Sequence, residues 1–284
     1  MIRRWLPYYL TLPSFIVPTA LTFAWILGLY YSLTDFDLRY GIRNYLGLGN
    51  YADLITRSPA FWGSVATTLK YSILAVGLST PIGFAVAMLL SQLTGLKTRL
   101  IRTIMMAPLC ISPVVATIMW RIIMGPTQGL LNYGLNLVGL PKLDWLGNPG
   151  IALWSLVIID LWLSVPFVTL IFYGGLQSLP KTPYEAAQVD GASRFFTFRK
   201  LTLPLMKPFL MIALLFRAAD ALNAFDTIYA STKGGPMRAT YMLNIYAYDN
   251  VIRWKQLGYG LAIMVVTYLI VYAVSKRLMA FWPR

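Results

Sequence analysis

The sequence contains no histidine and only one cysteine. These absences exclude a serine nucleophile with a histidine base, a His/Cys metal site and a disulfide within the chain. Cys110 stands in an apolar segment and is predicted to be a small buried residue without a chemical role. No G-x-x-x-x-G-K-[ST] phosphate loop occurs, and Gly47-Leu48-Gly49 lacks the third glycine of a dinucleotide loop. The chain is therefore predicted to be no enzyme and to bind no metal or cofactor itself.

Charge is scarce as well: 12% of the residues are Asp, Glu, Lys or Arg, whereas 58% are hydrophobic. This composition is typical of a protein that lies in the lipid bilayer. The formal net charge of +14 would suggest nucleic acid in a soluble protein. Here the basic residues flank apolar stretches instead of forming one face. They therefore indicate orientation in the membrane, and no nucleic-acid partner is expected.

Six apolar stretches are long enough to cross a bilayer, which requires roughly 20 residues. They lie at residues 8–32, 64–90, 101–124, 151–173, 205–229 and 257–280. This pattern predicts an all-α membrane protein with six transmembrane helices in a single domain, residues 1–284. Lys and Arg are denser on the side of the two termini than on the other side, which places both termini in the cytoplasm.

The second, third and fourth of these stretches contain prolines, at positions 81, 108, 113 and 166. Each removes a backbone hydrogen bond and is predicted to bend its helix unless neighbours compensate. Bent helices leave room for a central cavity, although kinks are common in any membrane bundle.

The longest interruption on the predicted cytoplasmic side is the segment 182–204, which reads as two short helices. Thr182, Pro183 and Glu185 fit the N-cap, first and third positions of the first helix. Ala186 and Ala187 put little bulk on its surface, so another body can approach it closely.

The second helix of this segment begins after a turn. Gly191 is predicted to end the first helix in a left-handed conformation, Ser193 to cap the second, and Pro204 to stop it. Between them, Phe195, Phe196 and Phe198 stand among the basic residues Arg194, Arg199 and Lys200. From the residues alone, a docking element and an amphipathic connector on the lipid headgroups are both open interpretations.

Ionisable side chains inside a span are costly and require a partner or a water-filled path. Asp160 lies near the middle of the fourth stretch. In the fifth stretch, Arg217 and Asp220 are three residues apart and can neutralise each other. A purely structural pairing between helices and a role in a solute path both remain open for these groups.

Asn223 and Asp226 follow in the same stretch, and on one continuous helix they would share a polar side with Asp220. No basic residue stands one turn away from them, which favours a solute path. Aromatic residues such as Trp162 lie nearby. Hydroxyls of a sugar need donors and acceptors, and its C–H faces pack on rings, so the predicted substrate path comprises Asp160, Trp162, Asp220, Asn223 and Asp226.

The segment 182–204 carries a resemblance to a known family. Glu185-Ala186-Ala187, Asp190-Gly191 and Leu203-Pro204 resemble the EAA loop of permease subunits in binding-protein-dependent ABC importers. Three further pieces resemble carbohydrate permeases of the maltose-transporter F-subunit type: Asp144–Pro149, Gly175–Pro180 and Gly234–Pro236. The likeness extends over nearly the whole chain.

The resemblance implies a type I ABC importer permease fold in the bacterial inner membrane. It implies that the loop is a coupling helix that docks on a cytoplasmic ATPase, through Glu185, Ala186, Ala187, Asp190, Gly191, Arg194, Phe195, Leu203 and Pro204. The implied partners are a second permease of the G type, two ATPase subunits that bind ATP and magnesium, and an extracytoplasmic solute-binding protein. The implied function is sugar import by alternating access.

Two alternatives stay open. A permease for glycerol 3-phosphate or another polar solute would belong to the same family, with Arg121 or Arg217 facing the phosphate. A secondary transporter would also carry intramembrane acids, but it would lack a capped docking loop and usually has more spans.

Overall fold

The computed structural model describes residues 2–42, 44–93 and 95–281, with side chains for residues 14–42, 44–93, 95 and 99–281. Within these residues the structure is helical, apart from isolated bridges such as the one between Thr34 and Tyr45. The chain forms two compact units. The side of the membrane on which the two termini lie stays a prediction.

Unit 1 comprises Met1–Trp62 and Tyr246–Tyr268. It contains α1 (Ile2–Ser32), α2 (Gly49–Arg57), η3 (Asp249–Arg253) and the beginning of α14 (Leu257–Met279). Gly258 lies against the carbonyl oxygen of Thr34, in a space that a Cβ atom would fill. The buried Asn50 amide donates to the carbonyls of Ser32 and Thr34 at 2.8 and 2.9 Å, so a polar side chain fixes the turn after α1.

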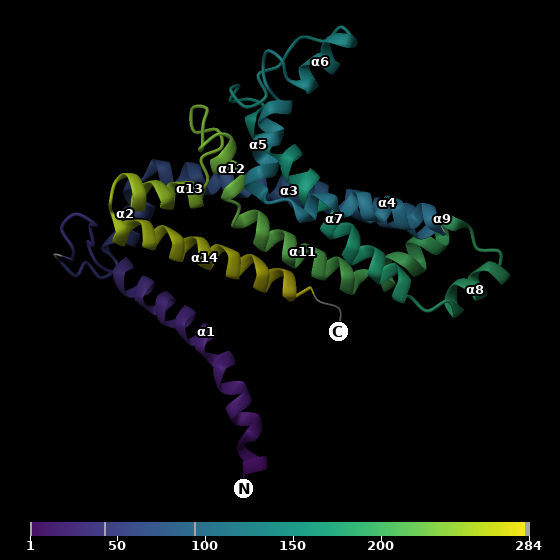
Figure 1. Cartoon of the computed structure of the whole chain (residues 1–284), viewed down its shortest axis with the longest axis horizontal. Coiled ribbons are helices and arrows are strands. Elements are labelled where there is room, and N and C mark those ends of the chain that lie inside the picture. Colours follow the sequence, from purple (N-terminus) through teal and green to yellow (C-terminus); the bar gives the residue numbers. More distant parts are fainter. Residues whose placement is uncertain (1, 43, 94, 282–284) are drawn as a thin grey trace. The chain divides into compact units, whose positions relative to one another are not determined.

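Unit 2 comprises Gly63–Ile245 and Leu269–Arg284 and contains the remaining helices, apart from residues 59–62 and 246–248, which belong to unit 1 (Figure 1). These are α3 (Pro59–Gln92), α4 (Leu96–Met106), η1 (Ala107–Cys110), α5 (Pro113–Ile123), α6 (Leu130–Leu137), α7 (Ala152–Ser178), α8 (Thr182–Val189), α9 (Arg194–Thr197), η2 (Phe198–Thr202), α10 (Leu203–Leu205), α11 (Lys207–Leu222), α12 (Asp226–Ser231) and α13 (Leu243–Tyr248). Their common core is built from Ala87, Val168, Phe172, Met206 and Ala213. Small residues let α3, α7 and α11 approach one another closely.

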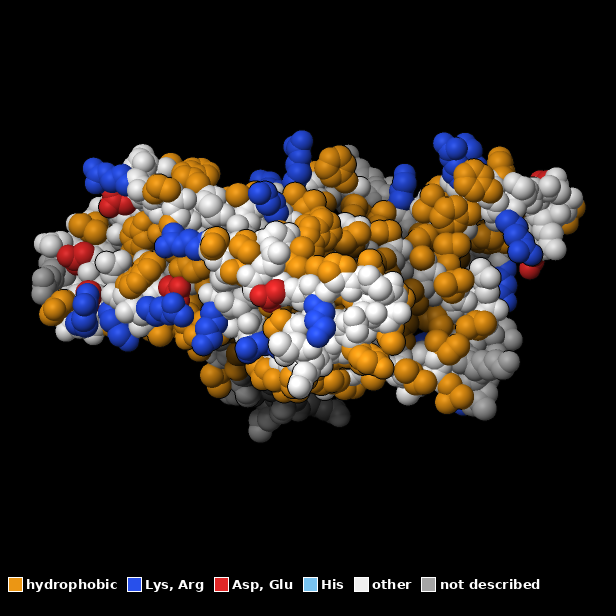
Figure 2. Space-filling view, turned by 90° about the horizontal axis from the view of Figure 1, so that it is seen from above, with side chains coloured by type: hydrophobic (Ala, Val, Ile, Leu, Met, Phe, Trp, Pro, Cys, Tyr) orange, Lys and Arg blue, Asp and Glu red, His pale blue; other side chains and the backbone are white. Residues whose placement is uncertain are grey.

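Four described helices are long and apolar enough to span a membrane, and six spans result if two bent pairs each count as one. The pairs are Arg99–Cys110 with Pro113–Ile123, bent by 101°, and Arg194–Leu205 with Lys207–Leu222, bent by 61°. Hydrophobic side chains cover wide areas of the face shown in Figure 2, as expected for a surface that contacts lipid. The prediction of an all-α membrane protein is confirmed, with two of its spans broken.

The prolines act differently at different positions. Pro108 lies in η1 and Pro113 opens α5, so the 101° bend falls where two prolines stand close together. Pro81 and Pro166 lie inside α3 and α7, which continue through them. The prediction that Cys110 is buried is wrong, because this bend leaves the thiol exposed at the end of η1.

Candidate functional site

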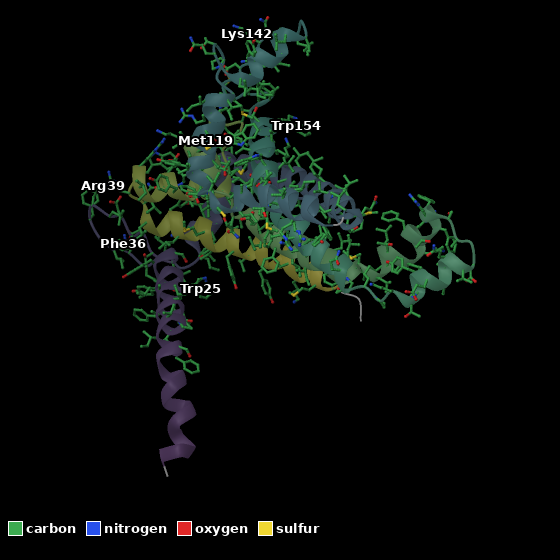
Figure 3. All side chains as sticks on the ribbon, turned by 45° about the vertical axis from the view of Figure 1, so that its right-hand side comes forward. Trp25, Phe36, Arg39, Met119, Lys142 and Trp154 are labelled. Atoms are coloured by element: carbon green, nitrogen blue, oxygen red, sulfur yellow. The ribbon has the colours of Figure 1, made fainter. Side chains whose placement is uncertain are left out.

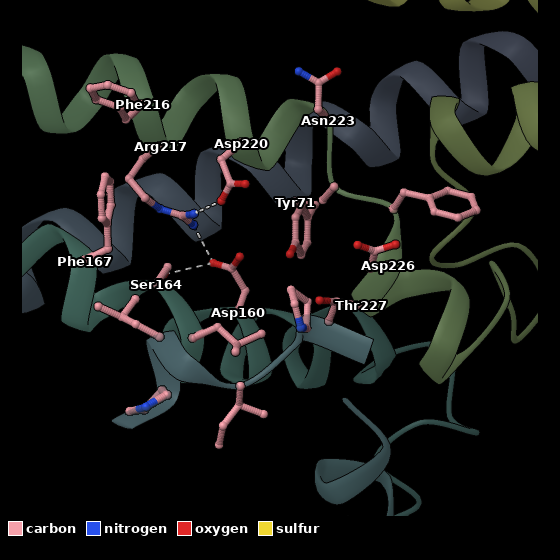
Figure 4. A pocket seen from close by; sticks show the side chains of 17 residues that line it. Tyr71, Asp160, Ser164, Phe167, Phe216, Arg217, Asp220, Asn223, Asp226 and Thr227 are labelled. Atoms are coloured by element: carbon pink, nitrogen blue, oxygen red, sulfur yellow. Dashed lines mark hydrogen bonds and ion pairs between the residues drawn. The ribbon is translucent and has the colours of Figure 1, made fainter. Parts of the chain in front are cut away.

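A cavity of about 490 Å³ lies in unit 2. Residues from α3, the bend between η1 and α5, α7, α11 and the beginning of α12 line it (Figure 4). It brings together four of the five residues predicted for the substrate path: Asp160, Asp220, Asn223 and Asp226. The fifth, Trp162, is outside the described lining and packs edge-on against Trp120, with 6.1 Å between the ring centroids.

An arginine is the centre of the polar contacts in this cavity. Nη2 of Arg217 donates to Asp160 at 2.6 Å, Nη1 donates to Asp220, and Nε donates to the hydroxyl of Ser79 at 3.2 Å. Figure 4 also shows the hydroxyl of Tyr71 turned toward Asp160. These contacts connect α3, α7 and α11 through one guanidinium group.

The two carboxylates differ in exposure. The Asp160 side chain is 12% exposed, whereas that of Asp220 is 73% exposed, and that of Arg217 is 2% exposed. The buried ion pair is therefore Arg217 with Asp160, and Asp220 is the carboxylate that remains open to the cavity. Charge removal at Asp160 would leave a buried cation with a single exposed partner, which is costly.

The predicted pairing of Arg217 with Asp220 is confirmed, but the sequence reasoning missed Arg217 with Asp160. Spacing of three residues on one helix signals the first pair. The second joins residues 57 positions apart, and only packing of α7 on α11 brings them together. Ser79 and Tyr71 were missed for the same reason.

The prediction of one continuous fifth helix is wrong. Helix α11 ends at Leu222, Asn223 is its C-cap, and Asp226 begins α12. The shared polar side that one helix would give is therefore absent in this region of the described chain. Asparagine suits a helix end, and its Nδ2 donates to the carbonyl of Ala219 at 2.9 Å. In Figure 4 Asn223 points away from Arg217, whereas Asp226 points toward Thr227 and Tyr71.

The segment 182–204 forms helices as predicted, but its first cap differs. Lys181 has helical φ and ψ of −77° and −31° and takes the N-cap position, with no side-chain bond. Since the helix begins one residue earlier than predicted, Thr182 lies inside its first turn and the proposed capping box is wrong. The turn itself is confirmed: Gly191 has φ +70°, and Oγ of Ser193 accepts from the amide of Phe196 at 3.2 Å.

Pro204 does not stop the second helix. The helical path from Arg194 continues through η2 into α10, and its 61° bend comes only before Lys207. Proline at position 204 has no amide hydrogen to donate, and the turn directly before it, η2, is a π-helix in which the amide of Leu203 bonds to the carbonyl of Phe198. The segment therefore connects to α11 through a bend and not through a break.

Helix α8 has no buried residue, and α8 and α9 lie at one end of unit 2, away from α5, α6 and α12 (Figure 1). The hydroxyl of Tyr184 donates to Oγ1 of Thr202 at 3.1 Å and joins α8 to η2. A second hollow of about 560 Å³ lies between these elements, with Gln188 and Met88 in its wall. Glu185, Ala186 and Ala187 thus stand on an exposed, braced helix.

Comparison with known proteins identifies the family. Residues 79–282 match the family described as the binding-protein-dependent transport system inner membrane component. The chain belongs to this family. It is therefore a permease component of an inner-membrane transport system, which agrees with its several apolar helices.

Similar proteins cover nearly the whole permease. The trehalose/maltose transport system permease protein MalF of Thermococcus litoralis is 34% identical over 272 residues, which is 95% of this chain and 91% of that protein. The probable ABC transporter permease y4oQ of Sinorhizobium fredii is 37% identical over 276 residues, covering 94% and 88%. A bacterial ABC transporter involved in import of the acidic polysaccharide alginate superposes with a TM-score of 0.85 at 22% identity, covering 99% and 98%, and shares the fold.

The permease also carries an ordered polar centre in the segment 125–150. The amide of Asn132, which is fully buried, donates to the carbonyl of Leu143 at 2.8 Å and accepts from Nε1 of Trp145 at 3.1 Å. Lys142 lies at the tip of this segment, and Trp154 follows it on α7 (Figure 3). The piece Asp144–Pro149 is thus part of a fixed structure and not a slack connection.

Proposed function

We propose that this permease translocates a sugar or sugar derivative into the cytoplasm by alternating access. The observation that carries the proposal is the cavity of about 490 Å³ beside the Arg217 cluster. Its size lies in the range of roughly 300–1,000 Å³ that small-molecule sites occupy. Its exposed polar groups, Asp220, Asn223 and Asp226, supply acceptors and donors for hydroxyls.

Aromatic side chains supply the other half of a sugar site. Phe167 and Phe216 pack edge-on at 5.9 Å between centroids in the cavity wall, and Phe225 stacks on Tyr229 at its other end. Rings of this kind pack against the C–H faces of a pyranose. The trehalose/maltose name of the relative from Thermococcus litoralis supports the same class of solute.

The energy for transport comes, in this proposal, from two partner ATPases that bind ATP and magnesium. The exposed surface of α8, braced by Tyr184 and ended by Gly191, is the docking element for one of them. The contact residues are Glu185, Ala186, Ala187, Asp190, Gly191, Arg194, Phe195, Leu203 and Pro204. The chain itself is non-catalytic. A second permease completes the cavity, and an extracytoplasmic solute-binding protein delivers the sugar.

The orientation that this assembly requires is tested by cysteine labelling in intact cells. In a Cys110→Ser background, we expect Arg199→Cys and Met279→Cys to react only with permeant reagents, and Asn136→Cys to react with impermeant ones. These three sites are exposed, whereas Asn50 is buried and unsuited to labelling. The opposite pattern would place α8 outside the cytoplasm and remove the ATPase contact.

Reconstitution of the whole importer in proteoliposomes tests the function. We expect uptake of labelled trehalose or maltose, or of another disaccharide in a panel, that requires both ATP and the binding protein. Uptake driven by a proton or sodium gradient without ATP would show a secondary transporter instead. Variants at the Walker lysine of the partner ATPase are the matched control, because they leave this chain unchanged.

A further inference from the structure

We infer that the cavity selects against anionic solutes, so that the sugar it passes is neutral or cationic. This inference rests on the proposed function and narrows its substrate class. It follows from the charges in the cavity wall and from the way in which its one guanidinium is held (Figure 4).

The described wall contains three carboxylates, those of Asp160, Asp220 and Asp226, and one cationic group, that of Arg217. With all four ionised, the formal charge of the wall is −2. The exposed groups are the side chains of Asp220 and Asp226, whereas the Arg217 side chain is only 2% exposed. A solute in the cavity therefore meets the negative groups first.

Arg217 is held away from solutes by its burial and by its existing partners. Its Nη2, Nη1 and Nε donate to Asp160, Asp220 and Ser79 respectively. Because this side chain is only 2% exposed, a phosphate, sulfonate or carboxylate could approach the guanidinium only by moving the exposed Asp220 aside, at the cost of leaving that carboxylate unpaired. Arginine at this position therefore neutralises the wall in part and does not form an anion site.

Arg121, the other arginine considered for a phosphate, is also turned elsewhere. Its Nη1 donates to the carbonyl of Ala230 at 3.2 Å, and the described cavity wall does not include it. The glycerol 3-phosphate alternative therefore lacks a free cation in this site.

Apolar walls strengthen the effect of the two exposed carboxylates. Leu109, Phe167 and Phe216 line the same space, and low-dielectric walls focus the field of charges in a cleft. Fold does not determine this property, since the permease of the same fold noted above belongs to a transporter that imports an acidic polysaccharide. The charges that this chain places in the wall act on the solute directly.

Thiol reaction rates measure this potential without knowledge of the sugar. In the assembled transporter carrying Cys110→Ser, Asn223→Cys is allowed to react with a cationic aminoethyl and an anionic sulfonatoethyl methanethiosulfonate. The ratio of the rate with the cationic reagent to the rate with the anionic reagent is divided by the same ratio measured for free 2-mercaptoethanol. At low salt we expect the cation to be favoured about tenfold or more. At 1 M salt the ratio should fall toward one, because the Debye length shrinks to about 3 Å.

Matched substitutions identify the source of the ratio. Asp226→Asn should lower it several-fold, whereas Asp144→Asn, which removes an exposed carboxylate outside the cavity and keeps an acceptor for the amide of Gly147, should leave it unchanged. A cysteine at the exposed position Asn136 shows that both reagents reach the folded protein. A normalised ratio near or below one, or a ratio that Asp226→Asn leaves unchanged, would overturn the inference.

Sugar uptake separates this inference from the proposed function. ATP-driven uptake of a neutral disaccharide together with a normalised rate ratio near one would overturn only the charge selectivity. A cation-selective ratio in a transporter that moves no sugar with ATP would overturn the proposed function and leave the acidic cavity in place.

Discussion

The helical path from Arg194 to Leu222 joins two regions of opposite character. At its first end, α8 and α9 contain no buried residue, and the turn between them depends on the left-handed Gly191 and on the Ser193 cap of α9. At its other end, Arg217 is buried and held by groups from three helices. The first region presents an exposed surface, which we propose as the ATPase contact, whereas the second region holds this chain's own helices around a cavity.

The difference shows in how each region responds to change. A substitution in an exposed helix impairs function by changing the shape of its surface, because little of the helix's stability depends on distant residues. A substitution in a buried ionic cluster lowers stability by removing a charge, because each member neutralises another and an unpaired buried charge is costly. The four predictions below test this contrast, from the largest expected effect to the smallest.

Gly191→Pro should abolish uptake while the protein remains in the membrane. Proline fixes φ near −65°, and Gly191 needs φ +70° to turn the chain from α8 to α9. Uptake by proteoliposomes and membrane content by immunoblot measure the two effects. Gly95→Pro is the control, since Gly95 has φ +76° and lies outside the docking segment. Equal loss of uptake in both variants would attribute the effect to general backbone strain and not to docking.

Asp160→Ala should destabilise the permease by about 3–5 kcal/mol, because it leaves the buried Arg217 with only the exposed Asp220 as an ionic partner. Asp220→Ala should cost less than about 1 kcal/mol, because this carboxylate is largely exposed to solvent. Thermal unfolding of the purified protein in detergent compares the two. The double variant Arg217→Met with Asp160→Leu should recover part of the loss. Equal destabilisation by the two alanine variants would show that the buried pair has no special role.

Asp226→Ala should lower the affinity for transported sugar about fivefold, because one hydrogen bond to a hydroxyl contributes on the order of 1 kcal/mol. Asp226→Asn should be milder, since an amide still donates and accepts. The concentration dependence of sugar-stimulated ATP hydrolysis is the measurement. Asp53→Ala, which removes an exposed carboxylate paired with Arg57 outside the cavity, is the control. Full stimulation in both Asp226 variants would contradict a place in the solute path.

Tyr184→Phe should raise the ATP hydrolysed per sugar transported by about twofold. It removes the one hydrogen bond that the described side chains of α8 give to η2, and a bond of this kind contributes about 1 kcal/mol or less. Thr202→Val removes the same bond from the other side and should act alike. Tyr133→Phe, at an exposed position on α6, should leave the ratio unchanged. If the ATP hydrolysed per sugar transported is unchanged in both variants, the hydrogen bond between Tyr184 and Thr202 does not support coupling.

The structure of the segment 182–204 was largely predictable from sequence, and that of the cavity only in part. Gly191 and Ser193 act within one turn of their own positions, so residue type and spacing identified their roles. The start of α8 was placed one residue late, and Pro204 was taken for a stop, because both depend on backbone angles that residue type does not determine.

The cavity required the packing of helices that are distant in sequence. Asp160, Asp220, Asn223 and Asp226 were found because polar groups in apolar stretches are conspicuous. The partner of Asp160, the contact with Ser79 and the helix end at Leu222 were not, because each depends on which faces of α3, α7 and α11 meet. A sequence pattern shows that a buried charge needs a partner without showing which one.

The pair between Asp160 and Arg217 has a consequence for biogenesis. With only 16 residues, two of them Arg217 and Asp220, α11 is too short to be among the described helices that can span a membrane alone. An arginine or aspartate at the centre of a span opposes insertion by about 2.5–3.5 kcal/mol. Helix α7 leaves the ribosome first, so its Asp160 is already in the bilayer when Arg217 arrives. Entry of α11 should therefore fall in an Asp160→Ala chain during cell-free synthesis on membranes, and unchanged entry would show that this helix inserts unaided.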